Sequence, residues 1–93
     1  MRIDNKGVNG NEVAAEMTAR LMTAFAPDRL EIENESHKHA GHAGDDGSGA
    51  SHFKVLIRAP ALAAMTRVER HRAVHGALGD LNVRVHAIAL DIG

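Results

Sequence analysis

The stretch Ser51-His52-Phe53-Lys54-Val55-Leu56-Ile57-Arg58 carries the alternating pattern of a β-strand near the middle of the chain. Phe53, Val55 and Ile57 fall on one face, and three polar side chains fall on the other. Because successive side chains of a strand point to opposite faces, this spacing predicts a strand over residues 53–57 that packs one face on the core. Leu56 interrupts the polar side, so the second face is expected to be partly covered.

A helix and a second strand are predicted ahead of this stretch. Apolar residues recur every four positions from Val13 to Phe25, which predicts an amphipathic helix with Asn11 as its N-cap. Pro27 disfavours helical geometry at the residue before it and should end the helix there. Residues 30–33 alternate apolar with acidic side chains and predict a short, half-buried strand.

The segment between the two strands, residues 35–51, is rich in glycine and nearly free of apolar side chains. It cannot contribute to a core, so we expect a flexible loop. The loop contains His37, His39 and His42, and His52 follows it directly. Residues 1–10 are polar and are expected to be disordered.

Two helices and a last strand are predicted downstream. Pro60 can open a short helix to about Met65, and a longer helix should run over residues 67–80. Its inner face is expected to contain the side chains Val68, His71, Val74 or His75, Leu78 and Leu81. Asn82 resembles a turn residue, and residues 83–92 are β-branched or apolar at most positions, which indicates a terminal strand. The predicted order is therefore α–β–β–α–α–β.

Composition limits the function classes. The 93 residues suffice for one domain, and the formal charge of −1 gives no reason to expect a strongly basic nucleic-acid-binding surface. The chain has no cysteine, so it supplies no disulfide and no thiolate ligand. No apolar run approaches the roughly 18 residues of a membrane span, and we expect a cytoplasmic protein that binds no membrane. No nucleophile with a base at fixed spacing indicates an enzyme.

Three stretches, in this order of elements, resemble the BolA family. They are Glu35-Ser36-His37-Lys38-His39, the strand Ser51-His52-Phe53-Lys54-Val55, and the combination of Glu69-Arg70-His71-Arg72-Ala73-Val74-His75 with Val85-His86-Ala87-Ile88-Ala89-Leu90. The similarity covers roughly residues 12–92. It implies one BolA-like domain over residues 1–93, with an α+β, KH-like fold of class II. The implied sheet has three strands, is mixed, and is covered by helices on one face.

The resemblance also implies a partner and a cofactor. BolA-type proteins form heterodimers with a monothiol glutaredoxin and share a 2Fe–2S cluster with it and with glutathione, for cluster trafficking or for iron and redox sensing. The isolated chain is expected to hold no cofactor. His86 falls on the family's terminal-strand ligand and His39 on its loop ligand, with His37 and His42 as competitors for the loop position. The other histidines, His52, His71 and His75, are expected to be structural.

Arg67, Arg70 and Arg72 surround His71 on the predicted long helix. They form either a solvated basic face or a contact to the glutaredoxin or to the carboxylates of its glutathione. Arginine suits the second role because its planar fork can bind both oxygens of a carboxylate.

Two other functions compete with the shared cluster. A DNA-binding transcriptional regulator would use the KH-like fold and needs a contiguous basic face, formed by Arg58, Arg67, Arg70, Arg72 and Arg84. Against it, the Gly-x-x-Gly matches at residues 41–44, 44–47 and 76–79 avoid the helix junction where KH domains carry that motif. The third function is divalent-metal binding by the histidines of the loop alone.

Overall fold

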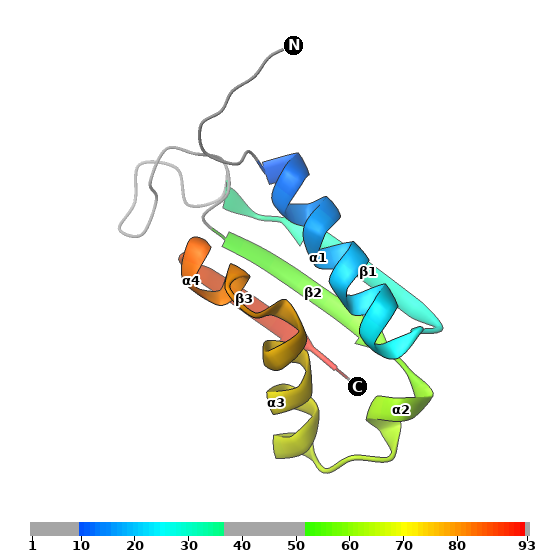
Figure 1. The fold of residues 1–93 in the computed structure, drawn as a ribbon. Helices are drawn as coiled ribbons and strands as arrows, with labels where there is room; N and C mark the ends of the chain where they lie inside the picture. Colours follow the sequence, from blue (N-terminus) through cyan, green and yellow to red (C-terminus); the bar gives the residue numbers. More distant parts are fainter. Residues whose placement is uncertain (1–9, 37–51, 93) are drawn as a thin grey trace.

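The computed structural model describes residues 10–36 and 52–92. The chain order is helix α1 (Gly10–Phe25), strands β1 (Arg29–Asn34) and β2 (His52–Arg58), helices α2 (Pro60–Ala63), α3 (Arg67–Leu78) and α4 (Leu81–Arg84), and strand β3 (Ala87–Asp91) (Figure 1). Ala26 follows α1 with a φ of 46°, directly before Pro27, and the helix ends there as predicted.

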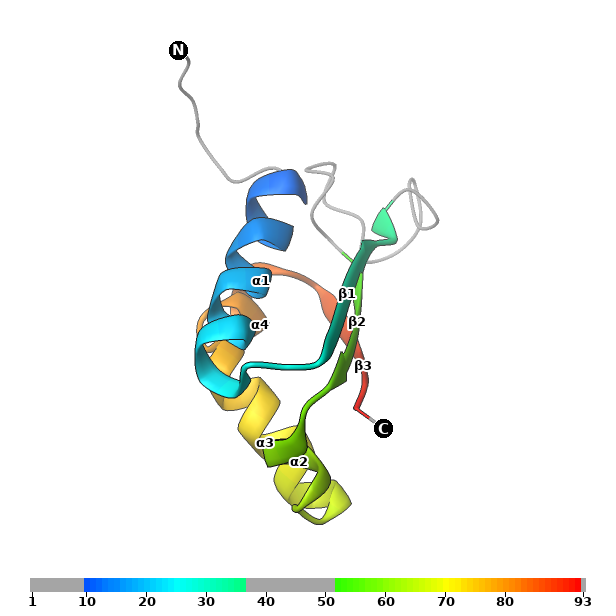
Figure 2. The ribbon, with the colours of Figure 1, turned by 90° about the vertical axis from the view of Figure 1, so that its right-hand side faces the viewer.

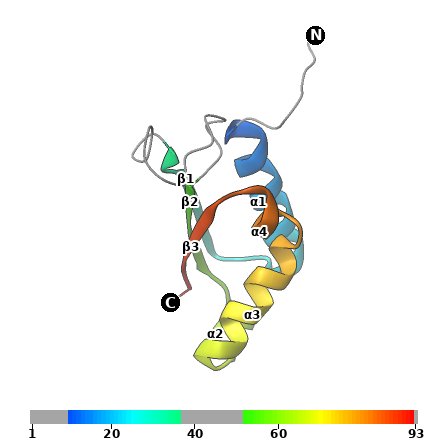
Figure 3. The same ribbon diagram turned by 90° about the vertical axis from the view of Figure 1, so that its left-hand side faces the viewer.

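The three strands form one mixed sheet in the order β1-β2-β3. The pair β1–β2 is antiparallel and the pair β2–β3 is parallel. Viewed along the sheet, α1 and α3 lie on the same side of it, and no helix of the described residues lies on the other face (Figures 2 and 3). The α+β fold with a mixed three-stranded sheet and helices on one face is therefore confirmed.

The core lies between the sheet and the helices. The inward side chains of β2 are Phe53, Val55 and Ile57, and all three are buried as their alternation predicted. They pack against the buried apolar side chains of α1, which are Val13, Met17 and Leu21, and against those of α3, which are Val74 and Leu78. Among the described helices, none is both long and apolar enough to cross a membrane.

The prediction of a strand over residues 83–92 is wrong at its start. Residues 81–84 form the helical turn α4, and the strand begins only at Ala87. Leu81 is fully buried, and the Asn82 side chain donates hydrogen bonds to the carbonyl oxygens of His75 and Gly79, both at 2.8 Å. These contacts hold the segment against the end of α3, whereas Val83 points outward and is 86% exposed.

Two further expectations need correction. Val68, expected on the inner face of α3, is 58% exposed. Asn11 lies inside α1, because the helix begins at the buried Gly10. Residues 1–9 and 37–51 lie outside the described residues, so the disorder and flexibility expected for most of 1–10 and 35–51 stay predictions.

Candidate functional site

His86 occupies the short connection between α4 and β3. The preceding Val85 is buried at 4% exposure, and its N–H donates to the carbonyl oxygen of Leu81 at 3.2 Å. The following Ala87 begins β3 and pairs with His52 in the parallel register. A buried anchor on one side and a strand on the other therefore fix the backbone of His86, while its side chain is exposed.

The structure brings His86 next to a histidine that the sequence analysis assigned a structural role. The imidazole rings of His52 and His86 lie 5.2 Å apart, centroid to centroid, with an interplanar angle of 52°. His52 starts β2 and His86 immediately precedes β3, so the parallel pairing of the two strands carries both rings to one end of the sheet. Spacing along the chain could not reveal this pair, because it depends on the strand register.

The backbone of His52 is fixed by the end of β1. Its N–H donates to Ser36 Oγ at 3.1 Å, and its carbonyl oxygen accepts the N–H of Glu35 at 2.8 Å. Ser36 is a buried polar residue, at 5% exposure. The His52 backbone therefore joins the start of β2 to the residues that follow β1, and its ring contacts His86.

The loop histidines His37, His39 and His42 lie outside the described residues. The residues that flank their segment, Ser36 and His52, lie against each other at the His86 end of the sheet. Which of the three histidines can approach His86 stays a prediction.

The donors present suit a metal centre that is completed from outside the chain. Within residues 10–36 and 52–92, no group of three or more potential ligands is close enough to hold a metal ion. Two neighbouring imidazoles are nevertheless available at one exposed position, and neutral imidazole nitrogen can bind iron. Because the chain has no cysteine, any thiolate ligand must come from another molecule.

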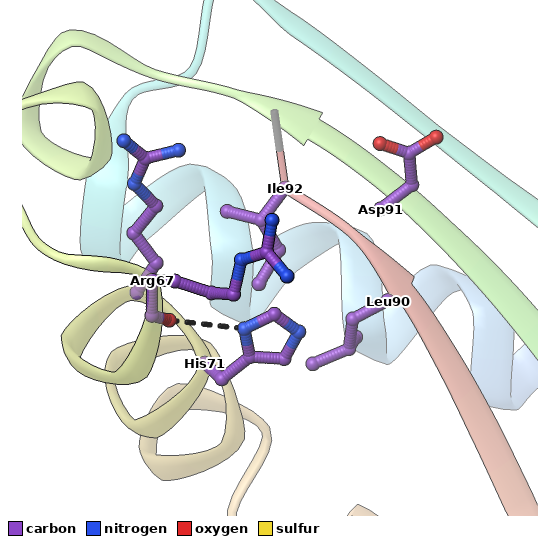
Figure 4. Close-up of a pocket in the computed structure, with 6 residues that line it drawn as sticks. Arg67, His71, Leu90, Asp91 and Ile92 are labelled. Atoms are coloured by element: carbon purple, nitrogen blue, oxygen red, sulfur yellow. Dashed lines mark hydrogen bonds between the residues drawn. The ribbon is translucent and has the colours of Figure 1, made fainter.

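Two of the three predicted partner-binding arginines, Arg67 and Arg70, line a hollow beside α3 and not the position of His86. Arg67 and Arg70 line an open hollow of about 680 Å³ between α3 and β3, together with His71, Leu90, Asp91 and Ile92 (Figure 4). Arg72 is exposed on α3 and does not line the hollow. His71, expected in the core, is only half-buried, and its Nδ1 lies 3.1 Å from the Arg67 carbonyl oxygen.

The hollow and His86 lie at opposite ends of β3. His86 precedes the first residue of the strand, and Asp91 and Ile92 stand at its other end. At roughly 3.3 Å per residue, the two ends are about 20 Å apart. Arg67 and Arg70 therefore lie toward the opposite end of β3 from His86, and their contact with a glutaredoxin or with glutathione carboxylates stays a prediction.

Two of the five arginines considered for DNA, Arg58 and Arg84, form ion pairs with aspartates. Arg58 Nη2 bonds Asp91 Oδ1 at 2.8 Å, and Arg84 Nη1 bonds Asp80 Oδ2 at 3.2 Å. The junction between α2 and α3 is residues 64–66, which include no glycine. These observations weaken the DNA-binding alternative.

An ion-pair network holds the helices that support His86. Arg20 on α1 donates to Asp80 Oδ1 at 2.8 Å and to the Leu78 carbonyl oxygen at 2.5 Å, and it also pairs with Glu16 at 2.6 Å. Hydrogen bonds from Arg20 and Arg84 lower the pKa of Asp80 below its ordinary value. The network ties α1 to the turn that leads into α4 and on to His86.

Comparisons with known proteins agree on one family. The family model of the BolA-like proteins matches residues 21–92. BolA-like protein 1 of Mus musculus is 39% identical over 79 residues, which cover 84% of this chain and 55% of the mouse protein. A protein of Haemophilus influenzae named DNA-binding transcriptional regulator BolA is 35% identical over 74 residues, which cover 78% of this chain and 68% of that protein.

A solved structure shows the same fold. BolA1 from Arabidopsis thaliana superimposes with a TM-score of 0.72 at 33% identity, and the match covers 98% of this chain and 93% of that one. This chain spans about half the length of the mouse relative that it matches.

Proposed function

Because the chain belongs to the BolA-like protein family, we propose that it is the non-catalytic partner of a monothiol glutaredoxin and shares a 2Fe–2S cluster with it. The cluster would serve iron–sulfur trafficking or iron and redox sensing. Within this proposal His86 is one ligand. The thiolate ligands come from the glutaredoxin cysteine and from glutathione.

The observation that carries the proposal is the position of His86. Its ring is exposed at the end of the sheet, and the backbone on both sides is held by Val85 and β3. A ligand that must be offered to a second protein has to be accessible and still well oriented. Imidazole in place of thiolate raises the reduction potential of such a centre, which is the chemistry that this chain would supply.

The second ligand is proposed to be His39, with His37 and His42 as competitors. The structure adds His52, whose ring lies 5.2 Å from that of His86. His52 can act as the second ligand itself, or it can orient the His86 ring while a loop histidine binds.

The proposal is tested by mixing the protein with a cluster-loaded monothiol glutaredoxin and recording visible absorption and circular dichroism. Wild type should change the spectrum, and His86→Ala should abolish the change. His39→Ala and His52→Ala separate the two choices for the second ligand. His71→Ala is the matched control, because His71 lines the hollow beside the far end of β3 and bonds only within α3 in the described residues, through its Nδ1 and the Arg67 carbonyl oxygen.

The outcomes divide clearly. Loss of the spectral change with His86→Ala and with His39→Ala, but not with His52→Ala, supports His86 and His39 as the ligand pair. Loss of the spectral change with His86→Ala and His52→Ala, but not with substitution of the loop histidines, moves the second ligand to the strand, whereas loss with all three of His86→Ala, His52→Ala and His39→Ala assigns His52 to orienting the His86 ring. An unchanged spectrum with wild-type protein argues against the shared cluster.

A DNA-binding transcriptional regulator is the second candidate function. The Haemophilus relative with that name favours it. The pairing of Arg58 and Arg84 with aspartates speaks against a broad phosphate-binding face. Salt-dependent binding of this chain to a DNA duplex, lost with arginine substitutions, would support it over the cluster.

Metal binding by the loop histidines alone is the third candidate. It requires no partner, so titration of zinc or nickel into the isolated protein separates it from the shared cluster. An affinity for zinc or nickel that depends on His37, His39 and His42 but not on His86 would favour metal binding by the loop alone.

A further inference from the structure

The hollow between α3 and β3 combines charged and apolar walls. Arg67, Arg70 and His71 come from the first turns of α3, and Leu90, Asp91 and Ile92 come from the end of β3. Figure 4 shows the Arg67 and His71 side chains on one side of the hollow and Leu90 and Ile92 facing them. A ligand lying in it would meet cations on one wall and aliphatic side chains on the other.

The charge of the hollow is positive. Arg67 is exposed, and within the described residues no acidic side chain forms an ion pair with it. The acid that lines the hollow, Asp91, is already compensated, because Arg58 donates to its carboxylate at 2.8 Å and to its carbonyl oxygen at 2.9 Å. Arg70 also lines an adjoining hollow of about 250 Å³ that contains Asp28. Three arginines and two aspartates therefore line the two hollows.

His71 adds a hydrogen-bond acceptor. Its Nδ1 lies 3.1 Å from the Arg67 carbonyl oxygen, which can only accept, so Nδ1 carries the hydrogen. In the neutral ring Nε2 is then an acceptor, and the ring lines the hollow. The hollow therefore offers donors for an anion and an acceptor for an N–H group.

We propose that this hollow binds an extended acidic segment of a partner protein. A carboxylate of the segment contacts Arg67 and Arg70, a neighbouring aliphatic side chain packs on Leu90 and Ile92, and a backbone N–H donates to His71 Nε2. A peptide carries all three groups. The phosphates of a nucleic acid offer acceptors, whereas the hollow also presents the apolar Leu90 and Ile92, and the adjoining Arg58 is already paired with Asp91.

The site is independent of the proposed cluster position. Its lining residues on the strand stand roughly 13–20 Å from His86 along β3, at about 3.3 Å per residue, so binding there requires neither glutaredoxin nor cluster. Failure of the shared-cluster proposal would leave this inference untouched, and the reverse also holds.

The test uses the full chain without glutaredoxin and the fluorescein-labelled peptide Gly-Asp-Leu-Asp-Leu-Gly, with Asn replacing both Asp residues in a control peptide. Binding is measured by fluorescence anisotropy at low salt and located by amide NMR shifts. Arg67→Gln and Arg70→Gln should each weaken binding by roughly tenfold or more, the size of a charge-assisted hydrogen bond. Arg72→Gln is the matched control, because Arg72 is exposed on the same helix outside the hollow.

Binding of the Asp peptide but not the Asn peptide, with shifts at residues 67–71 and 90–92 and loss on Arg67→Gln or Arg70→Gln, supports the inference. Arg67→Lys should recover part of the affinity, since the charge remains while the fork is lost. Three results would overturn it: no shift at these residues at millimolar peptide, equal binding of both peptides, or an equal loss with Arg72→Gln. Tighter binding of a DNA duplex at the same residues would assign the hollow to nucleic acid.

Discussion

His52 and His86 belong to different strands of the sheet, and their rings lie 5.2 Å apart at an angle of 52°. The parallel register that pairs His52 with Ala87 produces this contact. Each ring should therefore report on the other, whether or not a metal is bound.

We predict that His86→Ala changes the ring carbon-bound proton shifts of His52 in the isolated protein. The reason is that an aromatic ring at this distance alters the local magnetic field of its neighbour, and its removal also frees space for rotation. Two-dimensional NMR of the histidine rings measures the change. His71→Ala should leave the His52 resonances in place, because His71 lines the hollow beside the other end of β3, and equal responses to both substitutions would contradict the ring contact.

A second prediction concerns Val85, the buried residue that precedes His86. Val85→Asp should lower the free energy of unfolding by about 3 kcal/mol or more, because it places an unpaired charge at a position that is 4% exposed. Val83→Asp is the matched control, since Val83 is 86% exposed and a surface change there should stay within about 0.5 kcal/mol. Urea unfolding followed by far-UV circular dichroism compares the two. Similar losses for both variants would mean that Val85 does not belong to the core.

The elements with a complete periodic pattern could be predicted from sequence. The alternation around Phe53 and the four-residue repeat of α1 give the hydrophobic pattern of both elements, and both pack on the core as expected. α4 could not be predicted in this way. Val83 and Val85 favour a strand locally, but the burial of Leu81 and the hydrogen bonds of Asn82 outweigh that preference.

The candidate site was only partly predictable for a related reason. Family resemblance predicts His86 as a ligand, but the contact between His86 and His52 depends on strand register, and the separation of His86 from Arg67 depends on the direction of β3. Neither the strand register nor the direction of β3 can be derived from the spacing of residues within one element. The loop histidine His39 lies outside the described residues and stays a prediction.

The end of α3 supplies a third prediction. Gly79 has φ 56° and ψ −125°, and a Cβ there would lie 3.2 Å from Arg20 Nη1. Gly79→Ala should therefore cost about 1–3 kcal/mol of stability, because a side chain disfavours this backbone conformation. Gly76→Ala should instead stabilise the protein by roughly 0.5–1 kcal/mol, since Gly76 lies inside the helix and a Cβ there meets nothing within 4 Å. Thermal unfolding of the two variants should show shifts of opposite sign, and shifts of the same sign would refute the assignment of Gly79 as the helix-ending residue.

The last prediction follows from the network around Asp80. Its carboxylate accepts hydrogen bonds from Arg20 at 2.8 Å and from Arg84 at 3.2 Å, and these bonds lower the pKa of Asp80 from its ordinary 3.8. A carboxyl whose pKa is lowered in the folded state binds its proton less tightly there than in the unfolded chain. Its contribution to stability is therefore complete above about pH 5, and it is lost as the pH falls through the lowered folded value.

Asp80→Asn should accordingly lower the melting temperature at pH 7, and the gap to wild type should narrow between pH 4 and pH 2. High salt should narrow it as well, because the network is exposed to solvent. Melting curves by circular dichroism at a series of pH values measure the gap. Glu31→Gln is the control, since Glu31 pairs with Arg29 at 2.8 Å on the outer face of the sheet with both side chains more than half exposed, and such a pair adds little stability. A gap for Asp80→Asn that stays constant down to pH 2 would show that Asp80 acts through packing or helix geometry and not through its charge.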